Sequence, residues 1–166
     1  EIKQQLINTG ELDRLGAERH GAIRLGTAEE LETMRRLFAV MGMFPVGYYD
    51  LTPAGVPVHS TAFRAVSTEA LNISPFRVFT SLLRLELIED ESLRSKAKQA
   101  LENRNIFTDR AIELIETFEK QGGLTPEQGE EFVREALETF RWHETSPISK
   151  SLYDQLLSQH GLIADI

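Results

Sequence analysis

The stretch HGAIRLGTAEELETMRRLFAVMG, residues 20–42, joins a short strand-like run to an amphipathic helix. Thr27 precedes the helix, and a glutamate stands three residues later, which is the spacing of a capping box. Apolar side chains then recur at helical spacing, and Gly42 suits the residue that follows the helix end. Side chains alternate along a strand, so Ile23 and Leu25 share one face, which we expect to pack on the helix. A strand followed directly by a helix therefore begins the fold.

Three further strands are expected after this helix. The segments 44–51 and 56–66 are rich in β-branched and aromatic residues, and a Pro-Ala-Gly turn separates them. A polar stretch, 67–75, suits one helical turn. In the long apolar segment 76–88 a strand and a helix compete, and the early β-branched and aromatic residues favour the strand. The order is that of a β-α-β-β-β unit.

Helix-forming composition dominates the second half of the chain. Four helices are expected there, over residues 91–103, 107–121, 125–141 and 149–160. Residues 161–166, GLIADI, suit a final extended segment, and residues 1–19 are compatible with a leading helix. The fold class is therefore α+β. Residues 1–90 are expected to form the β-α-β-β-β module with its leading helix, and residues 91–166 a C-terminal helical layer that covers the module.

Composition excludes several classes of protein. The chain has 166 residues, 41% of them hydrophobic, which suffices for a buried core. A net charge of −8 and the absence of any basic run argue against nucleic-acid binding, which needs a basic face. Without cysteine there is no disulfide, thiolate metal site or cysteine nucleophile, and the cytoplasm is the default location. No apolar run approaches the roughly 20 residues of a membrane span.

His20 and Arg24 are the first candidate site residues. Both stand on one strand face with only Ala22 between them, about 13 Å apart along the backbone by the usual rise per residue. Neutral imidazole is a common metal ligand, and a guanidinium binds a carboxylate through two parallel hydrogen bonds. The pair therefore fits a metal ligand beside an anchor for an anionic substrate. A surface histidine and a solvent-directed arginine fit the same spacing, so the residues alone leave both interpretations open.

His59 and Arg64 are weaker candidates for residues that line a pocket. Their separation of five sends the two side chains to opposite faces of a regular strand, and only a bulge would reunite them. His59 fits either a ligand or a buried histidine held by hydrogen bonds, and Arg84 and Glu86 fit a structural ion pair. The sequence holds no HExxH, GxSxG, phosphate-binding glycine loop or dinucleotide fingerprint.

Long stretches along the chain resemble one family. These stretches are ERHGAIRLGTAEEL, MGMFPVGYYDL, AGVPVHSTAFR, PFRVFTSLLRLELI, LETFRWH and GLIAD. They are similar to the 2-oxoadipate dioxygenase/decarboxylases, the YdcJ-like proteins, which are distant relatives of the vicinal-oxygen-chelate superfamily. The resemblance implies two β-α-β-β-β half-barrel modules curled around a mononuclear Fe(II), with helical insertions over the barrel. It also implies oxygen-dependent conversion of 2-oxoadipate to 2-hydroxyglutarate, a step in lysine catabolism.

The resemblance implies roles for two residues of this chain. The HGAIR motif is where the family keeps its first metal histidine, here His20, and the arginine that grips the substrate carboxylate corresponds to Arg24. The family's other two ligands, a histidine and a glutamate, belong to a second module. Two histidines and one carboxylate leave positions on an octahedral ion for a 2-oxo acid and O2. By itself this chain is therefore expected to supply one ligand of three.

The expected partners are a small 2-oxo acid, O2 and the second module, with no nucleic acid and no membrane. The chain starts at Glu1 rather than a methionine and closes on an apolar segment, and both ends favour a part of a longer polypeptide. Two other functions stay open at this point. The chain fits a non-catalytic scaffold or binding module without metal, and it fits another metal-dependent isomerase or lyase of the same superfamily.

Overall fold

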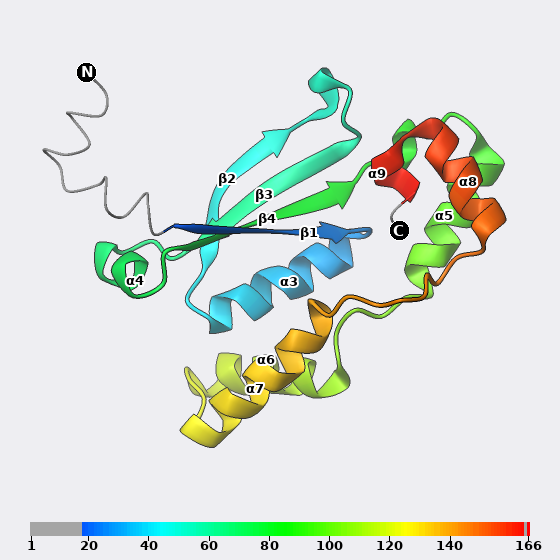
Figure 1. The fold of residues 1–166 in the computed structure, drawn as a ribbon. Helices are drawn as coiled ribbons and strands as arrows, with labels where there is room; N and C mark the ends of the chain where they lie inside the picture. Colours follow the sequence, from blue (N-terminus) through cyan, green and yellow to red (C-terminus); the bar gives the residue numbers. More distant parts are fainter. Residues whose placement is uncertain (1–17, 165) are drawn as a thin grey trace, which may run out of the picture.

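A four-stranded mixed sheet organises the molecule. The computed structural model describes residues 18–164 and 166 (Figure 1). The strands are β1 (Arg19–Leu25), β2 (Phe44–Asp50), β3 (Val58–Arg64) and β4 (Phe76–Leu83). They lie in the order β1-β4-β3-β2, with β1 parallel to β4 and the other two pairs antiparallel. A helix, α3 (Ala28–Val40), connects β1 to β2, as the sequence predicts.

The caps of α3 follow the sequence with one difference. The Thr27 hydroxyl accepts a hydrogen bond from the backbone N–H of Glu30, at 3.1 Å. The Glu30 carboxylate does not return to the Thr27 N–H, as a regular capping box would require, but accepts from the N–H of Gly26 at 2.6 Å. Gly42 adopts a positive φ of 72° just after the helix, which an L-residue with a side chain rarely adopts. Both ends of α3 are therefore fixed locally.

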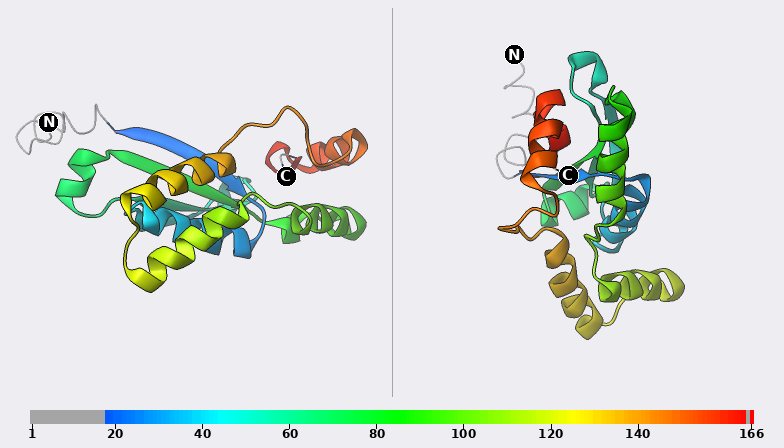
Figure 2. Two further views of the ribbon diagram at one scale, coloured as in Figure 1. Left: turned by 90° about the horizontal axis from the view of Figure 1, so that it is seen from below. Right: turned by 90° about the vertical axis from the view of Figure 1, so that its right-hand side faces the viewer.

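The main core lies between the sheet and α3. Ile23 and Leu25 of β1 pack there, as alternation predicts, against the buried Met34, Leu37 and Phe38 of α3. Two further helices, α6 (Asp109–Gln121) and α7 (Pro126–Thr139), extend the same core on the far side of α3. In Figures 1 and 2 these three helices lie on one side of the sheet.

A second core closes one end of the sheet. It combines Val58 and Leu83 of the sheet with side chains from α5 (Glu91–Glu102), α8 (Lys150–Gln159) and α9 (Gly161–Ala164). A buried ion pair ties the helical part to the first module, because both hydrogen bonds from the Arg104 guanidinium to the Glu30 carboxylate measure 2.7 Å. The division at residue 90 stays a prediction.

Two expected strands differ from the structure. Residues 161–164 are not extended, because α9 turns the chain through Gly161–Ala164. The His160 carbonyl accepts from Ile163 and Ala164, and burial of these two residues in the second core stabilises the turn. The strand expected over 76–88 ends at Leu83, and a 3-10 turn covers Leu85–Leu87.

Other expectations agree with the structure or lie outside it. The helical turn expected in 67–75 is α4 (Thr68–Ile73), and the tight turn after β2 is a 3-10 turn, Thr52–Ala54. The helix expected over 1–19 lies almost wholly outside the described residues. Within the described part of the chain, no helix is long and apolar enough to cross a membrane.

Candidate functional site on the open face of the sheet

The sheet face opposite α3 brings His20 and Arg24 together with further cations. Ile23 and Leu25 point into the core, so alternation places His20 and Arg24 on the other face. Residues that pair directly across neighbouring strands share a face of the sheet. His20 pairs with Arg77 of β4, and Arg77 pairs with Arg64 of β3, so both arginines lie on the same face as His20. In Figures 1 and 2, α3, α6 and α7 lie on the other side of the sheet, and the helices of the second core reach this face at its Val58 and Leu83 end. We call it the open face.

A buried carboxylate holds His20. Oε1 of Glu18 lies 2.9 Å from Nε2 of His20, and only 8% of the Glu18 side chain is exposed, against 56% of the His20 side chain. The same oxygen lies 3.4 Å from Nε of Arg77. A carboxylate on one ring nitrogen fixes the orientation of an imidazole and raises its basicity, which is a frequent arrangement around metal-binding histidines. Glu18 therefore links the histidine to the neighbouring strand.

Aromatic rings form the middle of the open face. The Phe79 ring stacks on His20 with centroids 6.4 Å apart and an interplanar angle of 21°. Tyr49, on the far edge strand, also reaches the Phe79 ring, at 6.4 Å. These two rings come from β2 and β4, so they close over Ala62 of the intervening β3, which is 1% exposed. The two rings therefore provide an apolar surface beside the half-exposed His20.

Three arginines give the open face its charge. Arg24, Arg64 and Arg77 come from three different strands, whereas the chain as a whole carries a net charge of −8. Nε of Arg64 is buried, and among the residues that the structure describes it has no hydrogen-bond partner. Guanidinium groups pair with carboxylates through two parallel hydrogen bonds. The open face can therefore bind a small anion that carries more than one carboxylate.

His59 lies on the sheet face opposite to Arg64, and its role as a residue that lines a pocket stays a prediction. Strand β3 pairs with β4 without interruption from Val58 to Arg64, so no bulge brings His59 round to the side of Arg64. Nε2 of His59 lies 2.6 Å from a terminal nitrogen of Arg84 and 3.5 Å from Asp50. The alternative of a histidine held by hydrogen bonds is therefore the one that the structure favours.

The surroundings of His59 are a charged network at the sheet edge. The expected ion pair between Arg84 and Glu86 is present, although both residues follow the strand rather than lie in it. Hydrogen bonds from the hydroxyl and the backbone N–H of Thr52 lower the pKa of Asp50. The network pairs Arg84 with both carboxylates, and we assign it a structural role.

Sequence reasoning missed four residues of the open face, Glu18, Tyr49, Arg77 and Phe79. Glu18 stands two positions before His20 and so shares its face on an extended backbone, which is a signal that alternation could have provided. Arg77 and Phe79 meet His20 only through the parallel register of β1 and β4, which local sequence does not specify. The described residues contain no group of three or more histidine, aspartate or glutamate side chains that could hold a metal ion. The open face thus offers one histidine to a metal, with its carboxylate partner.

The hollow between α3 and α5 is a weaker candidate for a ligand site than the open face. A hollow of about 680 Å³ lies between α3 and α5, and the paired Glu30 and Arg104 line it. Those two charges already neutralise each other through two short hydrogen bonds. A hollow whose charges are already paired is a weaker candidate for an anion site than the open face.

Known proteins match this chain over its whole length. A family model described as 2-oxoadipate dioxygenase/decarboxylase matches residues 1–166. The 2-oxoadipate dioxygenase/decarboxylase of Pseudomonas putida is 61% identical over 166 residues, which are 100% of this chain and 36% of that protein. The crystal structure of the hydroxyglutarate synthase from Pseudomonas putida in complex with 2-oxoadipate is also 61% identical. It superposes with a TM-score of 0.90 over 99% of this chain and 37% of that one.

A more distant structure shares the fold alone. A glyoxalase superfamily protein from Ralstonia eutropha JMP134 superposes with a TM-score of 0.68 at 22% identity, over 89% of this chain and 46% of that one. This likeness supports the vicinal-oxygen-chelate-like fold expected from the sequence. The chain spans a little over a third of the length of the curated relatives that it matches. The match over all 166 residues confirms the resemblance read from the motifs, and the chain belongs to the 2-oxoadipate dioxygenase/decarboxylase family.

Proposed function

We propose that this chain is the N-terminal part of an Fe(II)-dependent 2-oxo-acid dioxygenase/decarboxylase that converts 2-oxoadipate to 2-hydroxyglutarate. The observation that carries the proposal is the placement of His20 and Arg24 on one basic, open sheet face. The Pseudomonas putida structure that binds 2-oxoadipate supports the substrate class, because it matches this chain over 99% of its length. We further propose a cytoplasmic enzyme that acts in lysine catabolism.

His20 is the proposed metal ligand of this chain. Its ring is held by Glu18 at 2.9 Å and backed by Phe79, so its direction is set before any ligand binds. When bound, Fe(II) supplies the reaction with O2 that no amino-acid side chain can perform. The proposal takes the other two ligands, a histidine and a glutamate, from the second module of the complete polypeptide, where the two half-barrels enclose the site.

Arg24 is the proposed anchor for the distal carboxylate of the substrate. 2-Oxoadipate carries two carboxylates, and Arg64 and Arg77 add positive charge on the same face. Glu18 partly neutralises Arg77 at 3.4 Å, and within the described residues the buried Nε atoms of both Arg77 and Arg64 make no hydrogen bond. We propose that Arg64 assists the binding of the dianion and that Arg24 fixes its orientation. The rings of Tyr49 and Phe79 add an apolar surface on the same face.

A pair of histidine variants tests the assignment. Residues 1–166 replace the matching 36% of the Pseudomonas putida relative, and iron content and oxygen consumption with 2-oxoadipate are measured. His20→Ala should lose iron and activity. His59→Ala removes the histidine of the opposite face and should keep the iron. Wild-type iron content in His20→Ala would contradict the ligand assignment.

The same chimera separates the two alternative functions. Absence of stoichiometric iron in the unsubstituted chimera, together with unchanged 2-oxoadipate binding, would favour a scaffold or binding module. Bound metal and turnover of a 2-oxo acid without oxygen consumption would favour an isomerase or lyase. Arg24→Lys keeps the charge but loses the planar fork, so we expect a KM increase of roughly tenfold or more with iron retained, as loss of one charged hydrogen bond implies.

A further inference from the structure

Helix α7 carries two apolar stripes, and within the described part of the chain one of them is buried and the other is exposed. Phe132, Ala136 and Thr139 point inward and are buried. A second stripe consists of Val133, Leu137 and Phe140, at positions i, i+4 and i+7 of the same helical row, which are 53%, 60% and 43% exposed. The second stripe contributes little to the core of the described residues.

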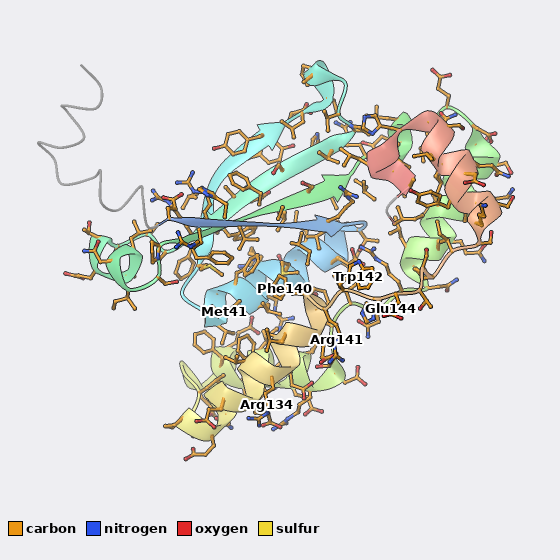
Figure 3. The ribbon with its side chains drawn as sticks, in the orientation of Figure 1. Met41, Arg134, Phe140, Arg141, Trp142 and Glu144 are labelled. Carbon is orange, nitrogen blue, oxygen red and sulfur yellow. The ribbon has the colours of Figure 1, made fainter. Side chains whose placement is uncertain are left out.

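The second stripe continues on both sides into a larger surface. Trp142, the single tryptophan of the sequence, follows the helix and is 80% exposed, and Met41 at the end of α3 is 41% exposed. Met41 and Val133 line one hollow of about 360 Å³. Figure 3 shows Phe140 and Trp142 where the end of α7 passes beside α3. The α7 apolar surface comprises Met41, Val133, Leu137, Phe140 and Trp142.

The α7 apolar surface is part of a rigid framework. The Phe140 ring stacks on the ring of Phe38, with centroids 6.3 Å apart, and Phe38 is 1% exposed in the main core. A capping box formed by Thr125 and Gln128 fixes the other end of α7. Single exposed apolar residues are common, but a contiguous helical stripe that ends in an exposed tryptophan is typical of a contact surface.

Its rim is charged in a pattern that suits a protein surface. Arg134, Arg141 and Glu144 stand around the apolar residues in Figure 3. Arg141 is paired with Glu138 at 2.9 Å, so the rim is not a strongly basic patch of the kind that nucleic acid or an anionic membrane needs. An apolar centre with a mixed polar rim is the usual anatomy of a protein–protein contact.

Two observations indicate which segment covers the α7 apolar surface: the length of the relatives and the position of Ile166. This chain matches the N-terminal 36% of the Pseudomonas putida relative, so most of that polypeptide comes after the matched segment. Ile166 lines a hollow of about 570 Å³ together with Thr139, Arg141 and His143, at the end of α7. In the relatives the chain therefore continues from a point beside the α7 apolar surface.

We propose that the α7 apolar surface is covered by the part of the same polypeptide that follows this segment in the family, with Trp142 as a central contact. This contact would hold the helical layer and the second module together at a distance from the open face. It does not depend on the metal or on the substrate, so it stands or falls separately from the proposed function.

Fluorine NMR of Trp142 tests the proposal directly. The isolated 166-residue chain and the chimera with the rest of the Pseudomonas putida relative are both labelled with 5-fluorotryptophan. The Trp142 signal is assigned in each by its loss in Trp142→Phe. We expect a large shift between H2O and D2O in the isolated chain, where the side chain is 80% exposed, and little or none in the chimera. An equally large solvent shift in both proteins overturns the proposal.

Matched surface variants provide a second readout. Leu137→Glu should lower the Tm of the chimera by several degrees and leave the Tm of the isolated chain unchanged, because only the chimera covers residue 137. Leu157→Glu is the control, since Leu157 is an exposed leucine of another helix, α8, at 48%. It should act alike in both proteins. Equal effects of the two variants in the chimera would count against the contact.

A second copy of the chain is the competing occupant, and sedimentation velocity distinguishes it. We expect the isolated chain to stay monomeric at the concentrations used for NMR. A dimer that shields Trp142 in the isolated chain, while Trp142 stays exposed in the chimera, would overturn the proposal in favour of self-association.

Discussion

The carboxylate of Glu18 lies 2.9 Å from Nε2 of His20, and the same oxygen reaches toward Arg77 on the neighbouring strand. A half-exposed histidine is thereby attached to a carboxylate that is itself only 8% exposed. The orientation of the imidazole is thus fixed by Glu18, which stands two residues earlier in the sequence and also contacts the neighbouring strand. Glu18 is a positioning residue in the proposed site, because it acts on the metal through His20.

Removal of this carboxylate should weaken metal binding without unfolding the chain. In the chimera, Glu18→Ala should lower iron affinity by roughly 10- to 100-fold, the usual cost of losing a hydrogen-bond partner of a metal ligand. Glu18→Gln keeps a hydrogen-bond acceptor and should lose less. Competition with a metal chelator measures the affinity. Glu29→Gln, an exposed carboxylate at the start of α3, is the control, and an equal loss in that variant would refute the positioning role.

The buried pair of Glu30 and Arg104 should be a principal source of stability. Both side chains are at most 15% exposed, and Glu30 also accepts the Gly26 N–H. Glu30→Ala leaves a buried guanidinium unpaired and should lower the free energy of unfolding by about 3 kcal/mol or more. Urea unfolding of the 166-residue chain measures it. Glu32→Ala breaks an exposed pair with Arg35 and should cost less than about 1 kcal/mol, so similar losses in both variants would disprove the distinction.

Two glycines should respond to alanine with opposite signs. A Cβ on Gly26 would lie 2.1 Å from Cδ2 of the buried Leu101, so Gly26→Ala should destabilise the chain by about 1–3 kcal/mol. Gly129 lies inside α7 with open space around it, and Gly129→Ala should stabilise by up to about 1 kcal/mol. Thermal unfolding measures both changes.

A double variant identifies the cause at Gly26. Leu101→Ala removes the atoms that a Cβ at residue 26 would meet. In the Leu101→Ala background, Gly26→Ala should therefore lower the stability clearly less than it does in the wild-type background. Additive costs would mean that steric overlap with Leu101 is not the reason for the glycine.

The ion pair between α3 and α6 should make stability depend on acid pH. Two hydrogen bonds from Arg36 lower the pKa of Glu119 below its ordinary value. A carboxyl with a depressed folded-state pKa binds fewer protons when folded, so its contribution is present above the unfolded-state pKa near 4.3 and lost as pH falls through the folded-state value. Glu119→Gln should thus lose more stability at neutral pH than at about pH 3. The Glu119 side chain is 44% exposed, so the difference should be small and should shrink in high salt.

Local signals in the sequence were enough for most of the elements. Thr27, Ser67, Thr108, Thr125 and Ser149 all cap helices in the structure, and their short hydrogen bonds to nearby backbone are local features. GLIADI was misjudged because its apolar residues suit a strand equally well, and only burial in the second core selects the helical turn. Burial of that kind depends on contacts with α5 and β4, which sequence order does not reveal.

The candidate site was predictable along one strand but not across strands. Alternation alone put His20 and Arg24 on one face, and counting five residues put His59 and Arg64 on opposite faces, as the register shows. Arg77 and Phe79 could not be found in this way, because their approach to His20 depends on which strand lies beside β1. The family resemblance came from the motifs and not from the spacing.

The order of the strands also has a kinetic consequence. Strands β2, β3 and β4 follow one another as antiparallel neighbours, whereas β1 reaches β4 only by parallel pairing of Arg19 with Phe76, far along the chain. Pairing between distant segments requires closure of a long loop, so β1 should join the sheet after the antiparallel strands have formed. Pulsed hydrogen exchange during refolding should therefore protect the amides of β3 before those of β1. The strand that carries His20 and Arg24 would then be the last to be added to the sheet, and the basic face would exist only once folding is complete.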